Sequence, residues 1–159
     1  MKLKIIVPVA VFILAFSSCK KDESYPLNHL YDLDVPLRGE TNDASAGFIK
    51  FRQNPDTARV ITLETWVTKL LHNHSYLLQR AVNPVADPTG CSSTAWLTLG
   101  EGLQPKSIVT DANGNGSANL WRDITAIARG TAFHIRFQIV DAATLAPVLK
   151  SDCFDYTVR

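Results

Sequence analysis

The feature that most constrains the fold of this chain is a strict alternation of apolar and polar side chains over residues 133–139, which read FHIRFQI. An extended strand places alternate side chains on opposite faces, so such a run predicts a strand with one face buried. The inward residues are Phe133, Ile135, Phe137 and Ile139, and the outward residues are His134, Arg136 and Gln138.

Shorter runs of the same kind recur along the chain and are separated by turn-forming segments such as NPVADPTG, GEGLQP and DAATLAP. We expect strands over residues 47–52, 59–67, 76–82, 94–99, 107–110, 117–121, 133–139 and 153–158. Residues 122–129 fit either a helical turn or a loop at a strand edge. Many short strands at this spacing predict an all-β fold, a two-layer antiparallel β-sandwich.

Leu70 and Tyr76 form an L-x5-Y pattern at the start of a predicted strand. This pattern resembles the tyrosine corner of fibronectin type III and other immunoglobulin-like domains. The resemblance implies an immunoglobulin-like sandwich in which the hydroxyl of Tyr76 bonds to the backbone across the corner.

The N-terminus has the order of an export signal. Lys2 and Lys4 precede an apolar run over residues 5–16, and Ser17-Ser18-Cys19 follows. Twelve helical residues span about 18 Å, which is too short for a hydrocarbon core of about 30 Å and suits a signal peptide. A plain signal peptide in which Cys19 is incidental is the alternative.

Residues 16–19, Phe-Ser-Ser-Cys, resemble the lipobox of bacterial lipoproteins. The resemblance implies cleavage before Cys19 and attachment of lipid to that cysteine, which would anchor the protein to a membrane. The following Lys-Lys-Asp resembles lipoproteins of the Bacteroidetes, and a Lys in place of Asp after the cysteine favours the outer membrane, on its periplasmic face or at the cell surface.

These assignments divide the chain into four parts: a signal peptide (1–18), a lipidated tether (19–25), an irregular N-terminal segment packing on the domain (26–45) and the β-sandwich domain (46–159). Loss of Lys2 and Lys4 with the signal peptide changes the net charge from +1 to about −1. No basic field remains that would attract nucleic acid.

Two cysteines remain once Cys19 is assigned to lipid. Cys91 and Cys153 are 62 residues apart, and an exported protein passes through an oxidising compartment. We expect a disulfide between them, with two buried thiols as the alternative.

Motifs that would carry catalysis or metal chemistry are weak. Residues 111–116, DANGNG, match the start of a calcium-binding EF-hand loop, but Arg122 stands where that loop needs a bidentate Glu. Asn-Gly favours a β-hairpin turn there. His72 and His74 would share a face of a strand, as metal ligands sometimes do. We expect no catalytic residues and no cofactor.

Three tryptophans, Trp66, Trp96 and Trp121, offer aromatic surface. In the alternation of residues 59–67, Trp66 falls opposite Ile61, Leu63 and Val67, so it is the best candidate for an exposed ligand-binding aromatic. The sequence therefore predicts a membrane-anchored, non-catalytic envelope lipoprotein that binds a protein or glycan partner or serves as a structural accessory. The alternative is a small metal-binding protein or metalloenzyme that uses His72 and His74.

Overall fold

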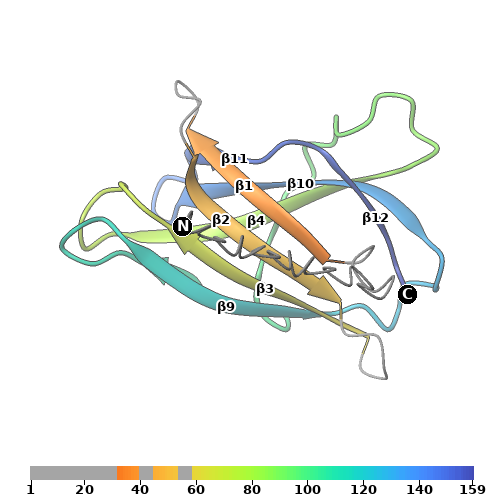
Figure 1. Ribbon diagram of the computed structural model, residues 1–159, viewed down its shortest axis with the longest axis horizontal. Coiled ribbons are helices and arrows are strands. Elements are labelled where there is room, and N and C mark those ends of the chain that lie inside the picture. Colours follow the sequence, from red (N-terminus) through yellow and green to blue (C-terminus); the bar gives the residue numbers. More distant parts are fainter. Residues whose placement is uncertain (1–31, 40–44, 54–58) are drawn as a thin grey trace, which may run out of the picture.

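A computed structural model describes residues 32–39, 45–53 and 59–159, and all regular structure in these ranges is β (Figure 1). The twelve strands are β1 (Asp32–Gly39), β2 (Ser45–Gln53), β3 (Val60–Val67), β4 (Ser75–Pro84), β5 (Leu97–Thr98), β6 (Gly100–Glu101), β7 (Gln104–Pro105), β8 (Ser107–Val109), β9 (Gly116–Asp123), β10 (Ala132–Asp141), β11 (Pro147–Lys150) and β12 (Phe154–Thr157). The predicted all-β class is confirmed.

The strands form one sheet that nearly closes into a barrel. Its hydrogen-bonded order is β5-β4-β10-β11-β1-β2-β3-β9-β6-β7, with β12 on β10 and β8 on β4. The layer of β1, β2, β3 and β9 faces the layer of β4 and β10, and β11 joins them on one side (Figure 1). On the other side β8 pairs with β4, and Thr110 bridges to Gly116 of the β9 hairpin. Two separate sheets of an immunoglobulin-like sandwich are therefore not confirmed.

The segment expected to be irregular, 26–45, contains a regular strand within its described part. β1 lies in the middle of the sheet, paired with β2 on one side and with β11 on the other. Val35 and Leu37 alternate inward and are fully buried, as their spacing predicts. The predicted signal peptide, Cys19 and the tether lie outside the described residues.

The core lies between the two layers and is built by alternation on the long strands. On β3, Ile61, Leu63, Thr65 and Val67 are buried, which confirms the predicted inward face of that strand. On β10, Ile135, Phe137 and Ile139 are buried, and Phe133 packs against the core from its rim. Gln138 of β10, expected to be outward, is also buried.

Gln138 is buried because a second layer of chain covers the outer face of β4 and β10. Its side chain donates to Gln79 of β4 at 2.8 Å, and Gln79 donates to Thr98 of β5 at 3.1 Å. Ser93 donates its backbone N–H to Asn83 at 2.9 Å, so the segment before β5 lies along β4. Alternation along a strand therefore predicts which face of the sheet a side chain occupies, but it does not predict whether that face is exposed to water.

The predicted disulfide between Cys91 and Cys153 is present, with the Cα atoms 5.8 Å apart. It ties the loop after β4 to the segment between β11 and β12. The next strand after Cys91 is β5, which pairs with β4, and the next strand after Cys153 is β12, which pairs with β10. The bridge therefore joins two parts of the sheet that are 62 residues apart in the chain.

Residues 111–115 form the hairpin turn that the Asn-Gly pattern predicts. The carboxylate of Asp111 accepts the backbone N–H groups of Asn115 at 2.9 Å and Asn113 at 2.8 Å. These two bonds hold the pKa of Asp111 below its ordinary value, because they stabilise the ionised form. Gly114 has a φ of +77°, and a Cβ there would meet the carbonyl oxygen of Leu70 at 2.2 Å. The two hydrogen bonds of Asp111 show that its carboxylate stabilises the turn.

Candidate functional site

Three aromatic side chains and one lysine lie on the outer side of three neighbouring strands, β2, β3 and β9. Phe48 and Lys50 of β2, Trp66 of β3 and Trp121 of β9 alternate with buried residues and so point away from the core. We call these four residues the outer aromatic face. Trp66 is 37% exposed and Trp121 is 42% exposed, which is unusual for the largest apolar side chain.

Contacts within this face fix the orientation of Trp66. Phe48 is its partner across the β2–β3 ladder, and the two ring centroids are 6.1 Å apart. The Nζ atom of Lys50 lies 5.3 Å from the centroid of the Trp66 ring, within the range of a cation–π contact. Trp66 is therefore held by its neighbours while part of its indole stays open to solvent.

Trp121 provides a second aromatic surface at a defined spacing. Trp66 pairs with Ser117, which is four residues before Trp121 on β9. At about 3.3 Å per residue, the Cα atoms of Trp66 and Trp121 are therefore offset by about 13 Å along the strand direction. Glu64 and Asn119, which face each other across β3 and β9, lie in the interval and supply hydrogen-bonding groups.

The outward orientation predicted for Trp66 is confirmed, and the same signal identifies Trp121. In both strands the tryptophan occupies an outward position between smaller residues that point inward. Trp96 is different: it lies near β10, where the guanidinium of Arg136 sits 4.9 Å from the centroid of its ring. Trp96 therefore belongs to another surface and does not join the outer aromatic face.

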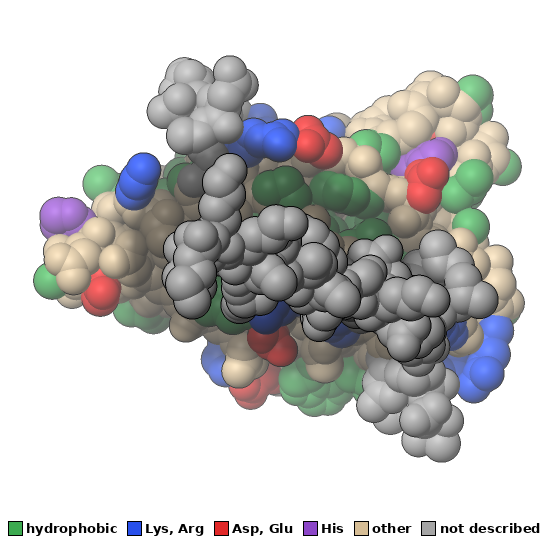
Figure 2. All heavy atoms as spheres, in the orientation of Figure 1, with side chains coloured by type: hydrophobic (Ala, Val, Ile, Leu, Met, Phe, Trp, Pro, Cys, Tyr) green, Lys and Arg blue, Asp and Glu red, His purple; other side chains and the backbone are tan. Residues whose placement is uncertain are grey.

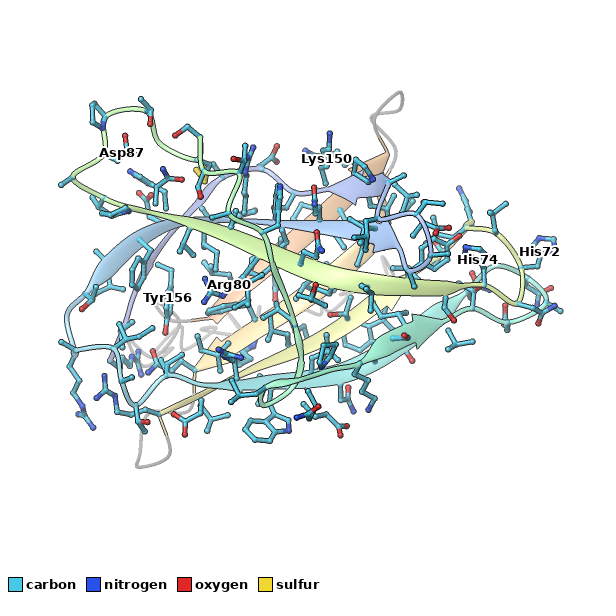
Figure 3. All side chains as sticks on the ribbon, turned by 180° about the vertical axis from the view of Figure 1, so that it is seen from behind. His72, His74, Arg80, Asp87, Lys150 and Tyr156 are labelled. Carbon is cyan, nitrogen blue, oxygen red and sulfur yellow. A yellow bond between two sulfur atoms is a disulfide. The ribbon has the colours of Figure 1, made fainter. Side chains whose placement is uncertain are left out.

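His72 and His74 do not share a strand face, because a turn separates them. Asn73 between them has a φ of +49°, which no extended strand adopts. The Nε2 atom of His74 contacts the carboxylate of Asp141, whereas His72 is exposed at the tip of the loop (Figure 3). The described residues contain no group of three or more His, Cys, Asp and Glu side chains that could hold a metal ion.

Asp141 organises the end of the molecule at which His74 lies. Its carboxylate accepts the backbone N–H groups of Thr144 at 2.8 Å and Ala143 at 2.9 Å in addition to contacting His74. These contacts, led by the Thr144 N–H and then His74, hold the pKa of Asp141 well below its ordinary value. The geometry is that of a capped turn, so we assign this carboxylate to structure.

A feature that the sequence analysis missed lies inside the opposite end of the molecule. Arg80 of β4 and Arg122 of β9 occupy inward positions in the alternation, and both line a cavity of about 160 Å³. The remaining lining residues are apolar or aromatic. The sequence did contain a signal for these arginines, because each continues the every-second-residue series of inward positions on its strand. The series on β4 is Tyr76, Leu78, Arg80 and Val82, and the series on β9 is Ala118, Leu120 and Arg122.

No family model, curated protein or solved structure matches the chain. No helix long and apolar enough to cross a membrane occurs in the described ranges. The described residues form a disulfide-bridged all-β domain with an aromatic outer surface and a partly open cavity lined by two arginines.

Proposed function

We propose that the protein is a lipid-anchored, non-catalytic binding module of the bacterial envelope and that its outer aromatic face binds a glycan. The observation that carries this proposal is the pair of exposed, oriented indoles, Trp66 and Trp121, with hydrogen-bonding side chains between them. This function does not require the immunoglobulin-like sandwich expected from the sequence, because one curved sheet presents the same kind of face.

The chemistry of the face suits a sugar chain. An indole offers a flat apolar surface that packs on the C–H face of a pyranose ring, as aromatics do in carbohydrate-binding modules. Glu64 and Asn119 offer a carboxylate and an amide that accept from and donate to hydroxyl groups. On the part of the described surface that is visible in Figure 2, basic and acidic side chains are interspersed, so this view shows no large patch of one sign.

Binding of a glycan array by the purified chain tests the function of this face. We expect a signal on a restricted set of glycans and a loss of affinity of at least about tenfold in Trp66→Ala, since buried tryptophans dominate most binding interfaces. Trp121→Ala should weaken binding to longer chains more than to short ones. Trp96→Ala is the matched control, because it removes an indole outside the face. The absence of any signal, or an equal loss in Trp96→Ala, would contradict the proposal.

The anchor is tested separately through Cys19. In a bacterial host, we expect the wild-type chain to fractionate with the outer membrane and to lose residues 1–18. Cys19→Ala should abolish incorporation of labelled palmitate and release the protein from the membrane fraction. Incorporation that persists in Cys19→Ala would overturn the assignment of Cys19 as the lipid attachment site.

A further inference from the structure

The cavity lined by residues of β4 and β9 combines an apolar wall with two positive charges, those of Arg80 and Arg122, and has no carboxylate among its described lining residues. Its wall includes Leu99, Ile124 and Phe137. The side chain of Arg80 makes no ion pair or hydrogen bond within the described residues, and the side chain of Arg122 donates one bond, from Nη1 to the carbonyl oxygen of Gly102 at 3.2 Å. Every ion pair in the described part of the chain involves other residues.

This arrangement is unfavourable in the free protein. Burial lowers the pKa of Arg80, and the charge of Arg122 lowers it further, because both disfavour a second guanidinium cation at this place. A buried charge is normally paired with an opposite charge. Figure 3 shows Arg80 between the two layers of strands, on the same side as Tyr156.

Tyr156 does not supply the missing anion. Its hydroxyl donates to Oε1 of Gln53 at 2.5 Å, and burial raises its pKa, so the phenol stays neutral. Asp123, which follows Arg122 on β9, is at an outward position outside the cavity lining. Its carboxylate accepts the backbone N–H of Thr125 at 2.7 Å and interacts electrostatically with Arg59 and Arg122. Within the described residues, the cavity therefore contains two cations and no anion.

We propose that this cavity binds a small apolar carboxylate, with the apolar body inside the cavity and the carboxylate between Arg80 and Arg122. A cavity of about 160 Å³ suits an apolar body of about one benzene ring, since engineered cavities of about 150 Å³ bind benzene. One carboxylate has two oxygens and can accept charge-assisted hydrogen bonds from both guanidinium groups. Binding would remove the repulsion between the two cations.

This site is independent of the outer aromatic face, because it lies on the inner side of the sheet. A glycan has no apolar body that would fill it, and an apolar acid has no ring hydroxyls for the outer face. Failure of one proposal therefore leaves the other intact.

Calorimetric titration of the full purified chain with 3-phenylpropionate tests the proposal. Two matched probes separate the contributions: 3-phenylpropanamide keeps the ring and lacks the charge, and acetate keeps the charge and lacks the ring. We expect the acid to bind at least about tenfold more tightly than either probe, the difference that one lost charge-assisted hydrogen bond or one unburied ring produces.

Variants locate the site. Arg80→Gln and Arg122→Gln should each weaken binding of the acid at least about tenfold, and Leu99→Trp should block it by filling the cavity. Arg136→Gln is the matched control, because that guanidinium lies over Trp96 and outside the cavity. Equal binding of the acid and the amide, or an equal loss in Arg136→Gln, would overturn the proposal.

A measurement on the wild-type chain keeps the test decisive if a variant does not fold. Amide shifts in a nitrogen–proton NMR spectrum should change around Leu99, Ile124 and Ile127 when the acid is added. Shifts confined to residues outside the cavity, or no shifts at about 5 mM acid, a concentration that detects a Kd in the low millimolar range, would overturn it.

Discussion

The two layers of the sheet are held together by different contacts at the two ends of the molecule. At one end, which we call the hairpin end, the loop 68–74 and the turn 111–115 interlock through hydrogen bonds. Tyr76 accepts the backbone N–H of Leu71 at 3.0 Å, and Thr110 donates its hydroxyl to the carbonyl of Leu71 at 2.6 Å. At the other end, which we call the cavity end, β4 and β9 carry arginines inward and leave a void.

The difference separates an end whose polar groups are satisfied by protein partners from an end that we propose binds a ligand. The hairpin end satisfies the polar groups of Thr110 and Tyr76 with protein partners, and such satisfied networks rigidify a fold. The cavity end keeps apolar surface and charge unsatisfied and is held instead by the Cys91–Cys153 bridge and by β12. A covalent link there compensates for incomplete packing.

The largest expected effect on stability concerns this covalent link. Replacement of both cysteines, Cys91→Ser with Cys153→Ser, should lower the free energy of unfolding by about 4 kcal/mol, as chain entropy predicts for a 62-residue separation. Urea unfolding of both proteins under non-reducing conditions measures it. Reducing agent should lower the stability of the wild type to that of the variant and leave the variant unchanged. A loss below about 1 kcal/mol would mean that packing alone holds the cavity end.

The next effect tests the hydrogen-bonded hairpin end. Thr110→Val should cost about 2 kcal/mol, because the hydroxyl donates to Leu71 and accepts the backbone N–H of His74 at 3.0 Å, and both groups would be left unsatisfied. Thr65→Val is the matched control: the Thr65 hydroxyl is buried and has no partner within the described residues. That substitution should be neutral or stabilising by about 1 kcal/mol. Equal losses in the two variants would contradict the comparison.

Part of this difference between the ends was predictable from the sequence. Tyr76 and the Asn-Gly turn are local patterns, and the structure confirms both the hydroxyl-to-backbone bond and the turn. The orientation of Trp66 was predictable from alternation, because burial of one face of a strand fixes the side on which every residue lies.

The remaining features depend on contacts that no local pattern encodes. β1 pairs with β11 through Arg38 and Lys150, more than a hundred residues apart, so closure of one sheet rather than formation of two was not foreseen. β11 itself is four residues long and begins with Pro147, which weakens any strand prediction. Arg80 escaped notice because a charged residue in a strand is normally read as solvent-exposed.

A smaller effect, of opposite sign, should appear at the cavity end. Arg80→Met removes one of two neighbouring cations and keeps the length of the side chain, so we expect the free protein to gain about 1 kcal/mol, limited by the partial exposure of Arg80. Arg38→Met is the control, because it breaks an exposed ion pair with Asp152 and should change stability by about 0.5 kcal/mol or less. Thermal unfolding measures both variants. A loss of stability in Arg80→Met would show that Arg80 is structural.

The smallest effect at neutral pH is expected for Asp141→Asn, because the amide oxygen of Asn still accepts the N–H groups of the turn. The difference appears in acid. The pKa of Asp141 is depressed in the folded state, so its carboxylate contributes stability fully above its unfolded pKa of about 4 and progressively less as pH falls below that value. The advantage of the wild type over Asp141→Asn should therefore shrink between about pH 5 and pH 2.

Asp87→Asn provides the counterpart at the cavity end. Bonds from the side chain and the backbone N–H of Thr89 also lower the pKa of Asp87, but by less than the pKa of Asp141 is lowered. Urea unfolding across this pH range should show that both variants lose less stability in acid than the wild type does, with the larger difference for Asp141→Asn. A larger difference for Asp87→Asn would place the stronger electrostatic constraint at the cavity end and reverse the assignment of the hairpin end as the more tightly bonded of the two.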